Sequence, residues 1–374
     1  MRIIIAPDSF KGSLSALQAG VIIHDAFKME LPLADMEVIP MADGGEGTLE
    51  NVVYAAGGQL LQCEVTGPLG SKIMAKYGIL RDNKTVVIEI AQIAGLTLVR
   101  SDKRNPLHTT TYGIGEVIKL AIHEGYRKFL IGLGGSATND GGLGMLQALG
   151  VSFYNKDNLH VLPFGYSVAK VTGVDYTTMM PEVKECVFEI ASDVDNPLCG
   201  VKGASATFGP QKGATPDMVL QLDSALANYA SIIEEHLGRS MQFKGGAGAA
   251  GGLGFAFLTL GAEIVSGAEL VAKASMLPEK IKQADWIITG EGQSDYQTLF
   301  GKVPGYIGKE ASKHNVKAIL VSGSLGKGYE DLYNYFVSCE SIAVGPSSLQ
   351  ECINHAESLL FKKARNIARM LNTK

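Results

Sequence analysis

A strand–loop–helix rhythm opens this chain, stops, and returns near its end. Close to the N-terminus, residues 2–6 and 35–41 predict buried strands, each followed by a loop and an amphipathic helix. Three more strands are predicted at 285–290, 317–323 and 340–345, again with helices after them. Neither end alone would easily close a hydrophobic core. The pattern therefore predicts one parallel sheet that takes strands from both ends of the chain.

The middle of the chain has a different pattern. Hydrophobic residues alternate with period two on both sides of the turn GPLG (67–70), which predicts antiparallel strands. Amphipathic helices are predicted at 113–125 and 215–238. Strands predicted at 127–135 and 185–191 lead into loops that are rich in glycine or in acidic residues.

Together the two patterns predict an α/β fold with two domains. Residues 1–60 plus 285–374 form a discontinuous parallel-sheet domain of normal size for a single core. Residues 61–284 form an inserted α+β domain with glycine-rich loops. Two capping boxes mark helix starts in the discontinuous domain: Ser15 with Gln18, and Ser348 with Glu351.

Composition excludes several classes of protein. The net charge of −5 and the lack of a Lys/Arg block argue against nucleic acid as a partner. No apolar run approaches the ~20 residues of a membrane span, and the short apolar start, followed by Asp8, is not a signal peptide. The five cysteines form no CxxC pair and the seven histidines no close pair. We therefore expect a cytoplasmic protein with reduced thiols, without a zinc site and without a membrane partner.

Acidic loops follow three strands of the predicted parallel sheet. Ligands of open parallel sheets bind at the carboxyl ends of the strands. Asp8, Asp43 and Asp295 would meet at that edge and repel each other unless a cation lies among them, and carboxylates with phosphates suit Mg²⁺. Alternatively, each acid caps a helix or a turn. Two of the loops also carry a lysine, Lys11 or Lys302; the loops are APDSFKG (6–12), MADGGEG (41–47) and TGEGQSDYQTLFGK (289–302).

Glycine-rich loops in the inserted domain could bind anions. The segment RKFLIGLGGSATNDGG (127–142) follows a strand and precedes a helix, so backbone amides and the helix dipole would face its loop. Ser136, Thr138 and Asn139 add neutral donors there. Lys212 in FGPQKGA is either a further cation of the site or a surface lysine. The segment KGGAGAAGGLG (244–254) either binds an anion or allows tight backbone packing.

Other functional classes have weaker support in the sequence. Gly132, Gly134 and Ala137 fit GxGxxA, with Asp157 about twenty residues on, as in dinucleotide-binding proteins. Antiparallel signals around this segment, and the charge of Asp140 beside a pyrophosphate, argue against that interpretation. No Walker loop or GxSxG elbow occurs in the chain. An NAD-dependent hydroxy-acid oxidoreductase and a non-catalytic sensor of a small acid or nucleotide remain as alternatives.

Seven segments together carry a resemblance to a known family. In chain order they are IAPDSFKGSLSA, MADGGEGT, GGSATNDGG, SDVDNPLCG, FGPQKGA, GGAGAAGGLG and TGEGQSDYQTLFGKVP. The chain resembles the bacterial glycerate kinase family, which is unrelated to P-loop and sugar kinases, over nearly its full length. The resemblance implies ATP-dependent phosphorylation of D-glycerate, with 2-phosphoglycerate the favoured product. It also implies ATP and Mg²⁺ as cofactors, a Rossmann-like domain, and a smaller domain of its own type.

Residue chemistry then assigns roles within this resemblance. The catalytic candidates are Asp8, Lys11, Asp43, Asp193 and Asp295, of which Asp43 and Asp295 are the predicted Mg²⁺ ligands. Asp193 with Asn196 is an alternative pair for the same work. We expect the active site in the cleft between the two domains. The sequence leaves open which acid is the base, which hydroxyl is phosphorylated and whether the protein is a homodimer. The predicted substrate- or phosphate-binding residues are Ser9, Gly44, Gly134, Gly135, Ser136, Asn139, Asn196, Lys212, Glu291 and Lys302.

Overall fold

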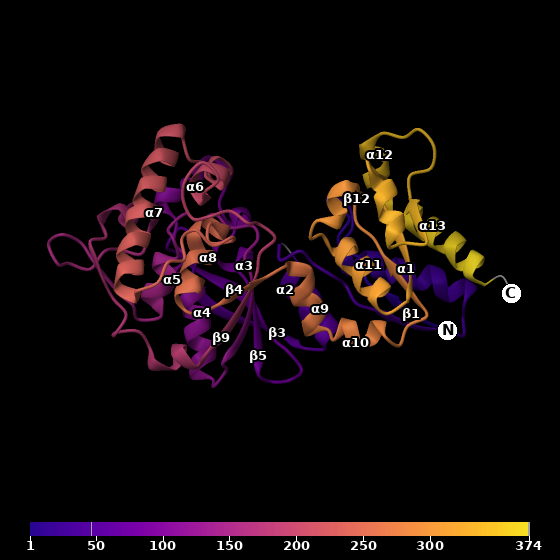
Figure 1. Ribbon diagram of the computed structural model, residues 1–374, viewed down its shortest axis with the longest axis horizontal. Helices are drawn as coiled ribbons and strands as arrows, with labels where there is room; N and C mark the ends of the chain where they lie inside the picture. Colours follow the sequence, from indigo (N-terminus) through magenta and orange to yellow (C-terminus); the bar gives the residue numbers. More distant parts are fainter. Residues whose placement is uncertain (46, 373–374) are drawn as a thin grey trace. The chain divides into compact units, whose positions relative to one another are not determined.

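The structure is a computed structural model that describes residues 1–45 and 47–372 (Figure 1). It divides into two compact units. The first, here called the split unit, comprises Met1–Asp43, Glu50–Gly58 and Ser266–Lys374. The second, the inserted unit, comprises Gly44–Leu49 and Gln59–Val265. The inserted unit is the larger of the two, whereas the family resemblance implies a smaller one, and it ends before the predicted boundary at 284/285.

The split unit is built on a five-stranded sheet in the order β15-β13-β11-β1-β2, and every neighbouring pair is parallel. As predicted, this sheet takes strands from both ends of the chain. Ile3 pairs with Trp286 on one side and with Met36 on the other. Such a sheet is covered on both faces, and Ile4 and Ile5 are accordingly fully buried. The strands are β1 (Arg2–Ile5), β2 (Asp35–Val38), β11 (Trp286–Thr289), β13 (Lys317–Ser322) and β15 (Ser338–Ser341).

The helices of the split unit mostly begin where their caps predict. The capping boxes at Ser15 and Ser348 are both present. Helices α1 and α13 pack on each other (Figure 1). The predicted C-terminal helix is interrupted at His355, whose φ of −111° and ψ of 12° are not helical, and β15 begins at Ser338, before the predicted position. The elements are α1 (Ala16–Glu30), most of α2 (Thr48–Ala56), α9 (Gly267–Ala274), α10 (Leu277–Ile281), α11 (Val303–Lys313), α12 (Leu349–Asn354) and α13 (Ala356–Leu371), the short pair β12 (Gln293–Ser294) and β14 (Ser324–Leu325), and the 3-10 turns η7 (Tyr296–Leu299) and η8 (Tyr329–Asn334).

The inserted unit contains a six-stranded mixed sheet in the order β10-β9-β6-β5-β4-β3. The pairs β3–β4 and β4–β5 are antiparallel, as predicted, whereas β5–β6, β6–β9 and β9–β10 are parallel. The glycine-rich loop after β6 and the acidic loop after β9 therefore lie at the same edge of a parallel arrangement. The strands are β3 (Gln59–Thr66), β4 (Lys72–Ile79), β5 (Thr85–Glu89), β6 (Lys128–Gly132), β9 (Val187–Ala191) and β10 (Glu263–Val265).

Helices pack on this sheet and enclose a large hydrophobic core. The longest, α7, begins at the capping residue Thr215 and ends at Gly238, whose φ of 67° suits glycine. The helices are α3 (Ala91–Ala94), α4 (Tyr112–His123), α5 (Leu143–Ala148), α6 (Ala204–Phe208), α7 (Pro216–Leu237) and α8 (Ala249–Thr259). Smaller elements are the hairpin β7 (Ser152–Tyr154) and β8 (Gly173–Asp175), and the 3-10 turns η1 (Leu96–Leu98), η2 (Ser101–Lys103), η3 (Pro106–His108), η4 (Gly165–Lys170), η5 (Pro181–Glu185) and η6 (Pro210–Lys212).

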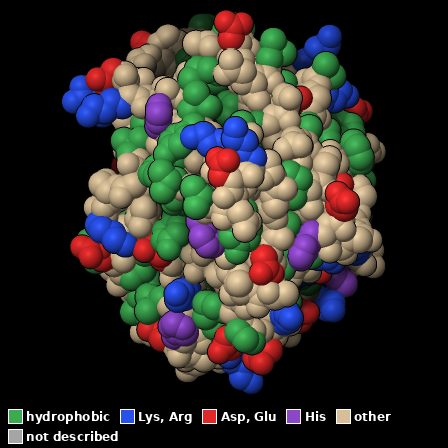
Figure 2. Space-filling model, turned by 90° about the vertical axis from the view of Figure 1, so that its left-hand side faces the viewer, with side chains coloured by type: hydrophobic (Ala, Val, Ile, Leu, Met, Phe, Trp, Pro, Cys, Tyr) green, Lys and Arg blue, Asp and Glu red, His purple; other side chains and the backbone are tan. Residues whose placement is uncertain are grey.

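Two surface properties bear on partners. Among the described residues, no helix is both long enough and apolar enough to cross a membrane. On the face drawn in Figure 2, basic and acidic side chains are interspersed among hydrophobic and uncharged ones, without a continuous basic field. This face lacks the clustered positive charge that nucleic-acid binding requires.

Candidate active site

Backbone hydrogen bonds place Asp8 at the carboxyl edge of the split-unit sheet. The Ala6 amide donates to the Ile288 carbonyl and the Asp8 amide to the Gly290 carbonyl, each at 2.8 Å. These bonds continue the pairing of β1 with β11 beyond the last residues of both strands. The residues directly after β1 are therefore held beside the loop that follows β11.

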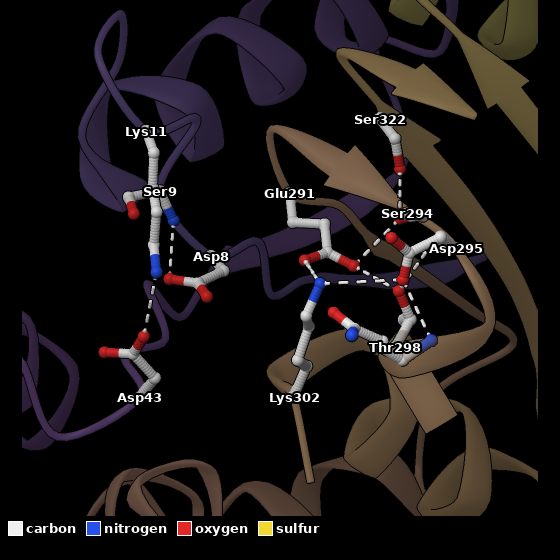
Figure 3. A network of polar contacts seen from close by, with 11 residues as sticks. Asp8, Ser9, Lys11, Asp43, Glu291, Ser294, Asp295, Thr298, Lys302 and Ser322 are labelled. Atoms are coloured by element: carbon white, nitrogen blue, oxygen red, sulfur yellow. Dashed lines mark hydrogen bonds and ion pairs between the residues drawn. The ribbon is translucent and has the colours of Figure 1, made fainter. Parts of the chain in front are cut away.

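Asp8, Lys11 and Asp43 form one polar group at this edge (Figure 3). The Lys11 Nζ lies 3.3 Å from Asp43 Oδ2, and the Ser9 amide donates to Asp8 Oδ1 at 2.6 Å. Asp8 is only 8% exposed, whereas the Lys11 side chain is 80% exposed. The lysine thus pairs with the partly exposed Asp43 and reaches the solvent, which suits a group that meets an incoming anion.

Burial, together with the nearby charges of Asp43 and Glu291, raises the pKa of Asp8 to about 7. The Ser9 amide and Lys11 act in the opposite direction but do not compensate. Asp43 raises the pKa of Lys11, which stays charged. The cluster therefore holds a carboxyl group that titrates near neutral pH beside a permanent cation.

Glu291 and Lys302 form a second polar group in the loop after β11 (Figure 3). Glu291 Oε1 accepts hydrogen bonds from Ser294 Oγ at 2.9 Å and Thr298 Oγ1 at 2.7 Å, and Lys302 Nζ lies 3.4 Å from Glu291 Oε2. Ser294 in turn bonds Ser322 at 2.6 Å. The carboxylate of Glu291 thus pairs with Lys302, and the predicted role of Glu291 in substrate or phosphate binding stays a prediction. The hydroxyls that fix this carboxylate were missed, although Ser294 and Thr298 stand in the same acidic segment.

Asp295 is a capping residue in this structure. Its Oδ1 accepts from the Gln297 amide at 2.8 Å, and its own amide donates to Thr298 Oγ1 at 3.1 Å, which forms a capping box at η7. Lys302 Nζ is 3.9 Å from Asp295 Oδ1. This is the alternative that the sequence left open, and it places Asp295 with Glu291 and Lys302, apart from the group around Asp8 in Figure 3.

The acidic side chains of the split unit could supply some of the ligands of a magnesium ion, with phosphates as further ligands. They do not form a complete metal site by themselves. In the part of the chain that the structure describes, no three His, Cys, Asp or Glu side chains are grouped to bind a metal. Mg²⁺ commonly takes only one or two protein carboxylates, with phosphates and water as its other ligands. Burial, and then the charges of Asp43 and Glu291, raise the pKa of Asp8, and Lys11 does not compensate for them, so a cation bound nearby would favour the charged form of Asp8.

The glycines after β6 are explained by packing against the loop that contains Gly44. The Gly134 amide donates to the Gly44 carbonyl at 3.0 Å, and a Cβ at Gly134 would lie 2.4 Å from the Gly45 Cα. Gly135 has a φ of 72°, where a side chain would be strained. Gly44, Gly134 and Gly135 thus have a structural reason to be glycine, and their role in phosphate binding stays a prediction. Glu46 of the same loop lies outside the described residues.

The start of α5 is occupied by a carboxylate of the protein itself. Asp140 is fully buried and accepts hydrogen bonds from the Thr111 amide at 2.9 Å and the Thr111 hydroxyl at 2.8 Å. It also accepts from the amides of Gly142 and Gly144, at 3.1 and 3.3 Å. These amides are therefore not open to a phosphate, which also argues against the dinucleotide interpretation of this segment.

Lys212 is buried, not a surface lysine. It is 2% exposed, and its Nζ donates to Ser136 Oγ at 2.7 Å and to the Thr138 carbonyl at 2.6 Å. Burial lowers its pKa to about 7, which the charge of Asp140 partly opposes. Asn139 is also buried, and its Nδ2 donates to Ser205 Oγ at 2.8 Å. Three residues of the predicted binding set, Ser136, Asn139 and Lys212, therefore lie in one buried polar cluster with Thr138.

The segment 244–254 packs directly against this cluster. A Cβ at Gly251 would lie 2.0 Å from the Thr138 carbonyl oxygen, and one at Gly252 would lie 2.8 Å from the Gly141 Cα. The Gly141 amide donates to the Gly251 carbonyl at 3.0 Å. The second alternative for this segment, tight backbone packing, is the one that the structure supports.

Asp193 and Asn196 follow β9 in the inserted unit. Asp193 is exposed. The Asn196 side chain donates to the Lys202 carbonyl at 2.7 Å and to Thr207 Oγ1 at 3.3 Å. Asn196 therefore orders its own loop, and the catalytic work of this pair stays a prediction.

Comparison with known proteins gives the family. The glycerate kinase family model matches residues 3–372. The chain belongs to the glycerate kinase family. It is therefore a kinase, and neither the oxidoreductase nor the sensor alternative is supported.

Individual relatives agree over nearly their full lengths. A protein named glycerate kinase from Halalkalibacterium halodurans is 44% identical over 98% of this chain and 97% of its own. A protein named glycerate 2-kinase from Escherichia coli is 42% identical over 99% and 98%. The crystal structure of a protein assigned as glycerate kinase 2 from Salmonella typhimurium LT2 is 40% identical, covers 99% of this chain and 98% of its own, and has a TM-score of 0.89.

Proposed function

We propose that this kinase transfers the γ-phosphoryl group of ATP to the 2-hydroxyl of D-glycerate and forms 2-phosphoglycerate. The name of the Escherichia coli relative supports the choice of hydroxyl. The observation that carries the proposal is the group formed by Asp8, Lys11 and Asp43. It combines a carboxyl with a pKa near 7, an exposed cation and a second acid at the ligand-binding edge of a parallel sheet.

In this proposal Asp8 accepts the proton of the attacking hydroxyl. A general base works best when its pKa is near the operating pH, and burial brings Asp8 into that range. Phosphoryl transfer otherwise needs positioning and neutralisation of charge more than covalent help. Lys11 supplies a cation beside Asp8, and Glu291 holds Lys302 as a second one. Both would stabilise the negative charge on the phosphoryl oxygens in the transition state.

Asp43 is the residue we propose for Mg²⁺, and Asp295 is the weaker second ligand because it already caps η7. When bound, Mg²⁺ would neutralise charge on the polyphosphate. Ser9 would donate to a phosphoryl oxygen or to the substrate carboxylate. A cytoplasmic location and a homodimer stay predictions.

Phosphorus NMR of the reaction products tests this function. With ATP, Mg²⁺ and D-glycerate, the wild-type protein should form ADP and the 2-phosphate ester. Formation of the 3-phosphate ester would refute the choice of hydroxyl. No ester at all, in a folded protein that ATP and Mg²⁺ protect against thermal unfolding, would refute the proposed reaction.

A further inference from the structure

The buried polar cluster of the inserted unit contains two side-chain atoms without a hydrogen-bond partner. These are Thr138 Oγ1 and Asn139 Oδ1, and both residues have no exposed surface. Buried polar atoms are rarely left unsatisfied in native proteins, and an exception calls for an explanation such as a ligand or water. The two residues are consecutive in the loop after β6.

Lys212 lies beside these atoms. Its ammonium donates to the carbonyl of Thr138 itself, and covalent geometry keeps Thr138 Oγ1 within a few ångströms of that carbonyl. An ammonium has three protons, and two of them bond Ser136 and Thr138. The Ser136 hydroxyl accepts from Lys212 and keeps its own proton for donation. Ser136, at 7% exposed, is where the cluster reaches the surface.

We propose that Ser136, Thr138, Asn139 and Lys212 form the subsite for the hydroxy-acid substrate. The substrate carboxylate would accept hydrogen bonds from Lys212 and from the side-chain hydroxyls of Ser136 and Thr138. The substrate hydroxyl that is not phosphorylated would donate to Asn139 Oδ1. This inference rests on the proposed function. It assigns the loop after β6 to glycerate, whereas the sequence left open whether this loop binds ATP or glycerate. The third Lys212 proton and the hydroxyls of Ser136 and Thr138 are donors that a carboxylate requires. Asn139 Oδ1 is an acceptor and needs an O–H group.

Charge distinguishes this ligand from a triphosphate. The cluster has a single cation, and the buried carboxylate of Asp140 lies close enough to influence the pKa of Lys212. The amides of Gly134 and Gly141 donate to protein carbonyls, and those at the start of α5 donate to Asp140. A loop that binds a triphosphate presents free amides instead. One lysine with neutral donors matches a monoanion, and a bound carboxylate would also hold the lysine in its charged form.

Thr138→Val tests the subsite because valine keeps the shape and removes the hydroxyl. Removing an unsatisfied buried group does not destabilise the free protein, so the thermal midpoint should be unchanged or higher. The KM for D-glycerate should rise about tenfold or more, and the KM for MgATP should stay the same. Thr138→Ser, which keeps the hydroxyl, should restore the KM for D-glycerate.

Ser167→Ala is the matched control. Its hydroxyl is also buried without a partner in the described structure, but it belongs to η4. This variant should match the wild-type protein in both KM values. If Thr138→Val raises the KM for MgATP instead, the loop binds phosphate. If it changes neither KM, Thr138 Oγ1 and Asn139 Oδ1 face only internal water. Either result overturns the inference. The wild-type product distinguishes this failure from a failure of the proposed function, which would leave no phosphoglycerate to measure.

Discussion

The acidic cluster of the split unit contains a lysine among carboxylates, and the buried cluster of the inserted unit has a lysine near the carboxylate of Asp140. The two clusters differ in how exposed these charged groups are and in which groups they contact. Lys11 is largely exposed and pairs with Asp43, and Asp8 keeps a raised pKa because it is buried and because its neighbours Asp43 and Glu291 are also acids. Lys212 is buried and its hydrogen bonds go to neutral groups, while Asp140 is satisfied by four donors. The first region therefore contains a buried carboxyl group whose charge is not compensated, whereas the second is defined by close packing around a buried lysine.

This difference indicates which substitutions should change activity and which should change stability. Charge that is not compensated in the free protein does not stabilise the fold, so its removal should lower turnover without lowering the free energy of unfolding. Close backbone packing has the opposite property, because added atoms must move the chain.

Lys11→Met should have the largest effect and should act on turnover. Loss of a cation that stabilises transition-state charge lowers kcat by about 10²–10³-fold. The exposed ion pair with Asp43 contributes at most about 1 kcal/mol to stability, so the free energy of unfolding should hardly change. Steady-state kinetics and urea unfolding measure the two quantities. A variant with normal kcat would remove Lys11 from the site.

Gly251→Ala should act on stability. The new Cβ would lie 2.0 Å from the Thr138 carbonyl oxygen, at a φ of 71°. The backbone of the 136–141 loop must shift, which should lower the free energy of unfolding by about 2–4 kcal/mol. Gly261→Ala is the control, because its φ is also positive but its Cβ would meet no atom within 4 Å. The control should lose only about 1 kcal/mol. Equal losses in urea unfolding would show that close packing is not the cause.

Asp43→Asn and Asp295→Asn should differ in their need for Mg²⁺. Loss of even an outer-shell partner commonly costs about 10–100-fold in metal affinity, so Asp43→Asn should need at least about tenfold more Mg²⁺ for half-maximal activity. Asn replaces Asp well as a helix cap, so Asp295→Asn should keep its stability, and as the weaker ligand it should raise the Mg²⁺ requirement less than Asp43→Asn does. The reverse order of Mg²⁺ requirements would exchange the roles of the two acids.

The sequence predicted the parts of the site that depend on strand order. A parallel sheet shared by both chain ends brings the loops after β1, β2 and β11 to one edge, so Asp8, Lys11 and Asp43 could be placed together before the structure was known. The caps at Ser15 and Ser348 are local and were also predictable. These features follow from periodicity and from neighbouring residues.

Other features depend on contacts distant in sequence. Nothing near Lys212 shows that its ammonium bonds Ser136, which is 76 residues away. The parallel pairing of β5 with β6 follows a crossover through α4, and the antiparallel hairpin before it concealed that change. Asp295 has the same residue type as Asp8 and Asp43, but Thr298 three positions later makes it a cap. Composition alone does not separate these roles.

The titration of Asp8 tests the central claim and also makes the free energy of unfolding depend on pH. Its pKa is about 7 in the folded protein and has an ordinary value of 3.8. Between these values the folded chain holds a proton that the unfolded chain releases, so this stabilising contribution is complete below pH 3.8 and is lost as the pH rises through 7. Asp8→Asn should therefore be more stable than the wild-type protein at pH 8.

The most direct measurement is kcat/KM for D-glycerate as a function of pH in the wild-type protein and in Asp8→Asn. The wild-type profile should rise with pH through an apparent pKa near 7, because Asp8 must lose its proton to act as the base. Asp8→Asn should fall by about 10²–10⁴-fold at the plateau and should lose this rising limb. A variant that keeps both the limb and the rate would contradict the account.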